Sequence, residues 1–318
     1  MLNAIAAALG PVFAVIVMGY ALKRWSIMRG PFGARFWPAA ENMTYFVLLP
    51  SLLFLSLARA DLGAVSVAPL VASLSGTIVI VAGLVLAARP WLRLSGPAFS
   101  SVMQSAIRPN TYVGVAPVFA LWGEDGLALL AVGIVSVIPL VNLLSVIAVS
   151  RFATAQTQPG PWAMLGLIAR NPLIIACVVG LALGAYRPGM LTGTMVGAGL
   201  SMAAGAAIPL ALLLAGFGLS GDGLRSHAGI LAVATVGKLI VVPGLTWLAG
   251  WWLGCEPAAV AAAVFLMAAP TAMASVPMAR LLGGDVPLAV AGVTATTVAA
   301  VFSLAGWLVA MGWWMARG

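Results

Sequence analysis

Arg108, Pro109 and Asn110 are the residues of this chain best suited to bind a ligand. They interrupt a hydrophobic stretch that covers residues 98–125. Because proline has no N–H and clashes with the preceding turn, a helix entering this stretch should end near Ile107, and a second helix should begin after Asn110. A guanidinium beside the amides at the start of a helix suits a carboxylate. The spacing therefore predicts a site for an organic anion at a helix break.

Side chains that form neutral hydrogen bonds flank this break and a second proline further along the chain. They are Asn110, Thr111, Thr271 and Ser275. These groups serve either the substrate or the backbone atoms that a broken helix leaves unpaired, and the sequence leaves both roles open. For Arg108 the alternative is a side chain that reaches the membrane interface or caps helix carbonyls. Four prolines shape the breaks without chemistry of their own, namely Pro109, Pro117, Pro270 and Pro277.

Lys238 and Glu41 are two further charged residues within hydrophobic runs. Lys238 is a second cation for the substrate, a partner for an acidic side chain, or a residue that snorkels to the interface. Glu41 is the one carboxylate expected inside a span, and proton-coupled transport usually needs such a buried titratable group. The two cysteines, Cys177 and Cys255, predict neither a disulfide framework nor a metal cluster, so no metal and no cofactor is expected.

The composition excludes a water-soluble protein. Hydrophobic residues make up 63% of the 318 residues and charged residues 7%. A soluble domain of this length cannot cover its surface with so little charge, so we expect a polytopic helical protein embedded in a lipid bilayer. The net charge of +8 does not indicate nucleic acid as a partner, because the basic residues are dispersed between apolar runs. The first run lacks a preceding basic segment, and we interpret it as a retained span.

Ten hydrophobic runs are long enough to cross a bilayer, which takes about 20 residues in a helix. They cover residues 3–22, 37–58, 66–88, 98–122, 127–150, 165–186, 190–217, 228–253, 257–282 and 286–314. The loops on one side carry Lys23, Arg24, Arg29, Arg35, Arg89, Arg93, Arg151, Arg170, Arg225 and Arg280, and those on the other carry Arg59, Arg187 and Arg317. This bias places the first set in the cytoplasm and both termini outside.

The second half of the chain repeats the first. The matched pairs are Pro11/Pro172, Gly19/Gly180 and Pro109/Pro270 at an offset of 161, Pro50/Pro209 at 159, and Pro117/Pro277, Gly123/Gly283 and Asp125/Asp285 at 160. An odd number of spans per copy forces the second copy to insert upside down, and inverted repeats with broken helices are typical of secondary transporters. We therefore expect a five-span repeat at 1–152, a central cytoplasmic loop at 153–163 and an inverted five-span repeat at 164–318.

These motifs resemble those of a known family. The run from Arg108 to Pro117 resembles the R-x-N…G-x-P signature of the auxin efflux carrier (AEC) family of permeases. The second break resembles that family's ninth-span motif through Pro270-Thr271-Ala272, Ala279, Gly283 and Asp285, and Asn171-Pro172, Lys238 and Pro243 fit it too. One departure is Ala274, which stands near a position where many members carry asparagine.

The resemblance implies an all-α fold shared with plant PIN carriers and bile-acid-type symporters. In that fold the broken spans four and nine cross at the substrate site. Spans 1, 2, 6 and 7 would form a scaffold and spans 3–5 and 8–10 a mobile core. The resemblance also favours a malate- or malonate-like substrate, and it alone suggests a homodimer. We expect a secondary transporter in a bacterial inner membrane that moves a small organic anion by alternating access.

An intramembrane protease is the competing class. Gly218-Leu219-Ser220-Gly221 matches the G-x-S-G string of rhomboid-type serine proteases, and His227 follows in the same predicted loop. A Ser–His dyad needs the imidazole to reach the hydroxyl in a protected site, and a loop end is a poor place for one. The aspartyl protease string G-x-G-D is absent, because Leu282 precedes Gly283-Gly284-Asp285. With a single histidine no H-E-x-x-H occurs, so an enzyme is not expected.

Overall fold

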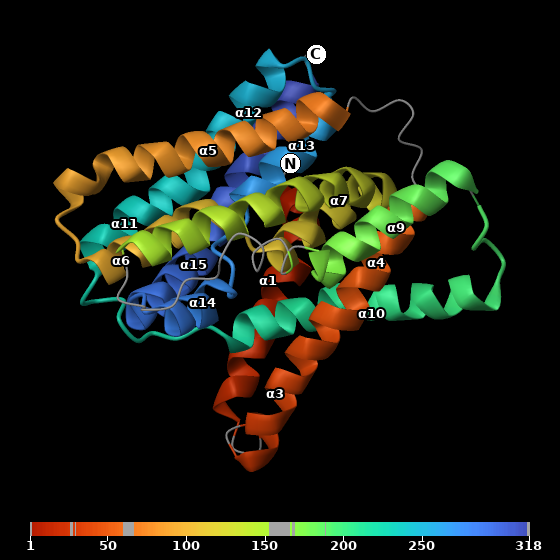
Figure 1. Cartoon of the computed structure of the whole chain (residues 1–318). Helices are drawn as coiled ribbons and strands as arrows, with labels where there is room; N and C mark the ends of the chain where they lie inside the picture. The colour runs from red at the N-terminus through yellow and green to blue at the C-terminus, as the bar shows by residue number, and fades with distance from the viewer. Residues whose placement is uncertain are drawn as a thin grey trace.

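The computed structural model is a bundle of helices (Figure 1). It describes residues 2–25, 28, 30–59, 67–152, 166, 169–187 and 189–316, and within these ranges no strand forms. The whole of the predicted central loop, 153–163, lies outside the described residues, as do Arg29, Arg317 and the last residue. The expectation of an all-helical protein is confirmed for the part of the chain that is described.

The helices follow the hydrophobic runs of the sequence. In the first half they are α1 (Leu2–Arg24), α3 (Pro31–Met43), the π-helical turn η1 (Thr44–Leu48), α4 (Leu49–Arg59), α5 (Val67–Leu92), α6 (Gly96–Ile107) and α7 (Thr111–Phe152). In the second half they are α9 (Pro172–Tyr186), α10 (Met195–Phe217), α11 (Ala228–Val236), the π-helical turn η2 (Gly237–Val241), α12 (Val242–Trp252), α13 (Pro257–Ala268), α14 (Ser275–Leu282) and α15 (Val286–Met315). Six of the described helical segments are long and apolar enough to cross a membrane, and α9 and α13 are shorter apolar helices.

Local sequence signals fix several helix starts. Ser95, Asn171 and Asp285 each accept a hydrogen bond from a backbone N–H of the first turn that follows, and each precedes a helix with proline at its first or second position. The long helix α7 bends at Gly123, whose φ is +57°. Only glycine adopts that conformation without strain. The bend lies next to Trp122, where the sequence predicts the end of this half-helix.

Helices α1, α4, α9 and α10 form one group, in which α1 packs on α10 and α4 packs on both α9 and α10 (Figure 1). Glycines permit the close approach. A Cβ atom on Gly180 of α9 would lie 2.6 Å from the carbonyl oxygen of Phe54 of α4. A Cβ on Gly19 of α1 would clash in the same way with the carbonyl of Leu213 of α10. Small residues that bring backbones together are typical of helix contacts in membranes.

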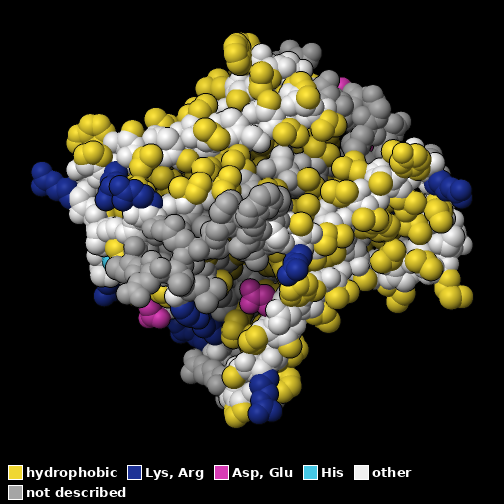
Figure 2. Space-filling model, viewed as in Figure 1, with side chains coloured by type: hydrophobic (Ala, Val, Ile, Leu, Met, Phe, Trp, Pro, Cys, Tyr) yellow, Lys and Arg dark blue, Asp and Glu magenta, His cyan; other side chains and the backbone are white. Residues whose placement is uncertain are grey.

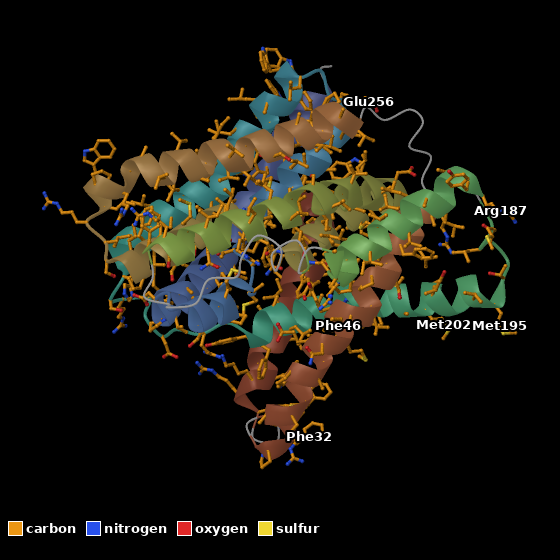
Figure 3. All side chains as sticks on the ribbon, viewed as in Figure 1. Phe32, Phe46, Arg187, Met195, Met202 and Glu256 are labelled. Carbon is orange, nitrogen blue, oxygen red and sulfur yellow. The ribbon has the colours of Figure 1, made fainter. Side chains whose placement is uncertain are left out.

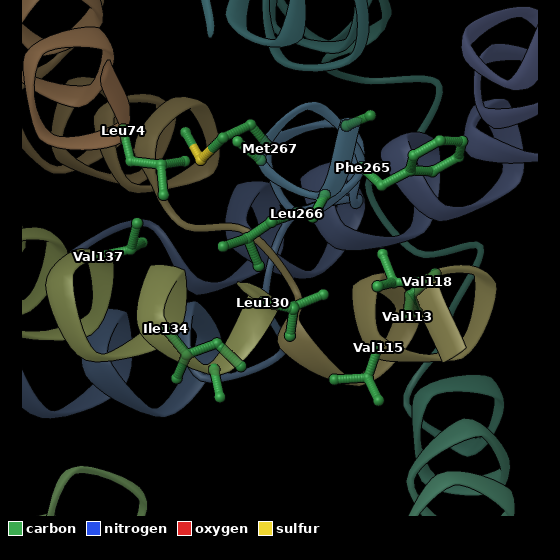
Figure 4. Packing of buried hydrophobic residues seen from close by; sticks show 14 of the residues in the cluster. Leu74, Val113, Val115, Val118, Leu130, Ile134, Val137, Phe265, Leu266 and Met267 are labelled. Carbon is green, nitrogen blue, oxygen red and sulfur yellow. The ribbon is translucent and has the colours of Figure 1, made fainter. Parts of the chain in front are cut away.

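Helices α5, α6, α7, α12, α13 and α15 form a second group, in which α13 packs on α5, α7, α12 and α15, and α6 packs on α5, α7 and α15. Every residue of α13 from Ala259 to Ala268 is buried. Figure 4 shows Leu266 of α13 between Leu74 of α5 and the α7 side chains that include Leu130. This core holds α13 at the centre of its group, and with it the chain break that follows Ala268.

Hydrophobic side chains also cover much of the outer surface. Figure 2 shows them across most of the visible described face, with lysine and arginine in separate groups. Met195 and Met202 of α10 are 90% and 80% exposed, and Figure 3 shows Arg187 and Met195 at one end of the molecule, away from Phe32. Such an apolar exterior is expected where lipid, and not water, contacts the protein.

Candidate functional site

The two breaks predicted from the prolines lie side by side. The first separates α6 from α7 and the second separates α13 from α14. Pro109 and Thr271 form an antiparallel β-bridge. The N–H of Asn110 donates to the carbonyl of Pro270 at 2.7 Å, and the N–H of Ala272 donates to the carbonyl of Arg108 at 3.0 Å. Segments about 160 residues apart in the sequence therefore satisfy each other's backbone hydrogen bonds at this point.

Thr271 replaces the donor that Pro109 lacks. In a continuous helix the carbonyl of Ser105 would accept from the N–H of residue 109, and proline has none. The hydroxyl of Thr271 donates to that carbonyl at 2.9 Å, and both residues are buried. The N–H of Thr271 in turn donates to the hydroxyl of Thr296 on α15 at 3.0 Å. The second break is thus hydrogen-bonded to α6 and to α15.

The neutral side chains of the site mainly satisfy local backbone groups. The side-chain oxygen of Asn110 caps α7 by accepting from the N–H groups of Tyr112 and Val113. The hydroxyl of Ser275 donates to the carbonyl of Ala272 at 2.8 Å. Of the two roles left open by the sequence, local backbone satisfaction is the one visible here for Asn110, Thr271 and Ser275. Thr111, the first residue of α7, is half-buried.

Arg108 is 7% exposed and lies at the end of α6. One terminal nitrogen of its guanidinium lies 3.3 Å from the hydroxyl of Ser145 and 3.3 Å from the sulfur of Met278. Its Nε is buried without a hydrogen-bond partner among the described residues. A hydroxyl and a thioether are weak partners for a cation. Within the described part of the chain no carboxylate compensates this buried charge.

Three residues near Arg108 were not predicted as site residues. Tyr45 on η1 interacts electrostatically with Arg108. Tyr112 interacts electrostatically with both Tyr45 and Glu41. Gln104, one turn before Arg108, is fully buried, and neither of its amide atoms has a partner among the described residues. The sequence offered only a weak signal for Gln104, a single amide in an apolar run. For the tyrosines the signal was absent, because their proximity depends on how the two helix groups pack.

A cavity of about 770 Å³ leads toward the breaks. Its walls come from α1, α3, α10 and the segment after α10, and Tyr112 and Met273 line it where it approaches the two breaks. Glu41 also lines it, together with Lys23 and Arg24. The cavity is therefore lined both by basic residues at the end of α1 and by Tyr112 at the start of α7.

The remaining predicted residues take no part in the bridge between the two breaks, although Lys238 binds the last turn of α13 before the second break. Lys238 is fully buried in η2, and its ammonium donates to the carbonyl of Met267 at 3.0 Å. The hydroxyl of Ser220 lies 2.6 Å from a carboxylate oxygen of Asp222. The ring of His227 contacts the hydroxyl of Ser226 and the carbonyl of Gly223. These contacts do not pair Ser220 with His227. Pro117 and Pro277 lie within α7 and α14.

Comparison with the models of known protein families gives a match. The model of a protein family described as "Membrane transport protein" matches residues 4–308. The match includes both breaks, the cavity and nearly the whole chain. No curated protein matches.

Proposed function

This chain belongs to the membrane transport protein family, of the AEC type, and we propose that it moves a small organic anion such as malate or malonate across the membrane by alternating access. The family match makes it a transporter and confirms the resemblance of its motifs to AEC permeases. Nothing in the contacts of Ser220 and His227 supports the protease alternative.

The buried guanidinium of Arg108 is the observation that supports an anionic substrate. A cation within a membrane costs about 2.5–3.5 kcal/mol or more, and its described partners are one hydroxyl and one thioether. A carboxylate would supply the missing negative charge. Each charge-assisted hydrogen bond to it would contribute roughly 1.5–3 kcal/mol. Bonds of this strength offset much of the free-energy cost of removing water from a carboxylate, and they are weak enough for the bound anion to be released.

We propose that the anion lies at the amino-terminal ends of α7 and α14. The positive end of a helix dipole favours negative charge there. The side-chain nitrogen of Asn110 and the hydroxyl of Thr111 are the neutral donors of this proposal, because the oxygen of Asn110 already caps α7. Thr271 and Ser275 would act indirectly, since their hydroxyls hold the backbone of the second break. Glu41 and Tyr112 would line the route from the cavity.

The alternating-access part of the proposal rests on the internal repeat. Two packing contacts support it, since Gly19 meets Leu213 as its repeat counterpart Gly180 meets Phe54. The repeat positions Gly123 and Gly283 both have positive φ, +57° and +77°. We propose ten spans in two inverted repeats, with α1, α4, α9 and α10 as scaffold. Helices α5–α7 and α11–α15 would form the moving core that carries the crossed breaks.

The membrane orientation is part of the same proposal. We propose that the end of the cavity with Lys23 and Arg24 faces the cytoplasm of a bacterial cell and that both termini face outward. A homodimer through the scaffold is proposed from the family resemblance. The bilayer and the anion are the partners this function requires.

A thermal-shift screen against a panel of organic acids tests the substrate class. A ligand of the folded state should raise the melting temperature according to RT ln(1 + [L]/Kd). We expect mono- or dicarboxylates to stabilise the wild type and to lose this effect in Arg108→Met. Arg280→Met is the matched control, because Arg280 is exposed in the last turn of α14. Equal stabilisation of wild type and Arg108→Met, or stabilisation by neutral or cationic compounds only, would overturn the proposal.

A further inference from the structure

Lys238 is a fully buried cation that the proposed anion site does not use. Its side chain has an exposed fraction of 0%, and its ammonium donates to the carbonyl of Met267 at 3.0 Å. Among the described residues, no acidic side chain interacts with it electrostatically. A long side chain that merely snorkels would place its charge at an interface. Lys238 instead keeps its side-chain nitrogen inside the core group of helices, on a backbone carbonyl.

The carbonyl that Lys238 binds is free because of the second break. In a continuous helix the carbonyl of Met267 would accept from the N–H of Thr271. That N–H donates to the hydroxyl of Thr296 instead. Met267 therefore lies in the last turn of α13 with its normal donor removed. The carboxyl end of a helix carries about half a negative charge, so a cation at this point is stabilised.

The backbone of η2 sets the position of Lys238. Residues 237–241 form a π-helical turn, which widens the helix by one residue. The carbonyl of Leu239 in this turn accepts from the indole N–H of Trp307 at 2.8 Å. This bond links η2 to α15, while Lys238 points toward the end of α13. Single π-helical turns often mark functional positions in membrane and soluble helices.

Lys238 thus places a buried cation at the carboxyl end of the broken helix α13. Arg108 follows the other broken helix, α6, but its guanidinium contacts Ser145 and Met278 and none of the described α6 carbonyls. In many secondary transporters the carbonyls at such half-helix ends coordinate a sodium ion that is moved with the substrate. We propose that Lys238 is a built-in cation in the place of a coupling sodium ion, so that this carrier binds and moves its anion without sodium. The inference rests on the proposed function and adds the coupling to it.

The first test compares salts on the wild-type protein. Anion binding is measured by thermal shift in NaCl, KCl and N-methyl-D-glucamine chloride at equal ionic strength. We expect Kd values that agree within about twofold and a melting temperature of the free protein that does not depend on which cation is present. Binding that requires NaCl, or stabilisation of the free protein by sodium alone, would overturn the inference while leaving the anion-transport proposal intact.

The second test empties the position. Lys238→Ala removes the ammonium and leaves the Met267 carbonyl exposed to a small space, whereas Lys238→Met fills a similar volume without charge. We expect Lys238→Ala to have a lower melting temperature that sodium partly restores relative to N-methyl-D-glucamine. We expect Lys238→Met to be destabilised without that response. A folded Lys238→Ala protein with no preference for sodium would contradict the inference.

The two tests distinguish a failure of the proposed anion transport from a failure of the proposed role of Lys238. If no organic acid binds in any salt, the proposed function fails, and the sodium response of free Lys238→Ala still decides the role of Lys238. If Lys238→Ala cannot be purified in folded form, the salt comparison on the wild type still decides whether the carrier needs sodium, and a sodium requirement overturns the inference.

Discussion

Replacing Thr271 with valine should destabilise the junction of the two breaks. Valine has nearly the shape of threonine but no hydroxyl. In the wild type this hydroxyl donates at 2.9 Å to the carbonyl of Ser105, which has no helical donor because residue 109 is proline. Thr271 has an exposed fraction of 0%, so water cannot take over the bond. The substitution therefore leaves a buried carbonyl unpaired.

The expected cost follows from that unpaired group. Leaving a buried acceptor unsatisfied costs about 1–3 kcal/mol. Hydrogen bonds between membrane helices average only about 0.6 kcal/mol, because the freed groups often find other partners. Here Pro109 removes the nearest alternative donor, so we expect a value in the upper range. Thr271→Ser keeps the hydroxyl and loses one methyl group, which should cost about 0.8 kcal/mol.

The free energy of unfolding of purified variants, from a denaturing-detergent titration, measures these costs. Thr246→Val is the matched control, because Thr246 is equally buried and its hydroxyl donates to the carbonyl of Val242 within α12. That carbonyl keeps its helical N–H partner when the hydroxyl is lost. We expect Thr271→Val to cost more than both Thr246→Val and Thr271→Ser. If it costs no more than either, the Ser105 carbonyl does not depend on the Thr271 hydroxyl as its donor.

Two further predictions concern packing and topology. Gly180→Ala should lower the free energy of unfolding, because its Cβ would lie 2.6 Å from the Phe54 carbonyl oxygen and would push α9 away from α4. The control is Gly76→Ala on α5, whose Cβ would meet nothing within 4 Å and which should be neutral or stabilising in the same titration. Equal effects of the two substitutions would contradict this prediction. The orientation is tested by cysteine labelling in a variant without Cys177 and Cys255. A cysteine in place of the exposed Ser226 should react with a membrane-impermeant thiol reagent only from the cytoplasmic side, and a cysteine in place of Met195 only from the outside. The opposite labelling pattern would reverse the proposed orientation.

Much of the fold follows from the sequence because helix signals are local. Pro109 and Pro270 predicted breaks at the positions where α6 and α13 end. The predicted start of a helix after Asn110 is confirmed, and Asn110 itself caps that helix. The number of membrane crossings remains a prediction, since six described segments satisfy length and hydropathy and several others are interrupted or short.

The site was harder to predict because its contacts join distant segments. Arg108 was selected by its charge alone, but its contacts with Ser145 and Met278 depend on the tertiary packing of α7 and α14. The roles of Thr271 and Lys238 depend on which backbone donors each break removes, and that requires the hydrogen bonds of both breaks. A pattern of residue types cannot show which carbonyl has lost its partner.

Counterflow in proteoliposomes measures directly whether the protein carries an organic anion through Arg108. Vesicles that contain the purified protein are loaded with unlabelled malate or malonate, and uptake of the radiolabelled acid from outside is followed in sodium-free buffer. We expect uptake by the wild type and by Arg280→Met, and loss of uptake by Arg108→Met that still folds. Uptake by Arg108→Met equal to that of the wild type, or no carboxylate exchanged by any form of the protein, would contradict this expectation.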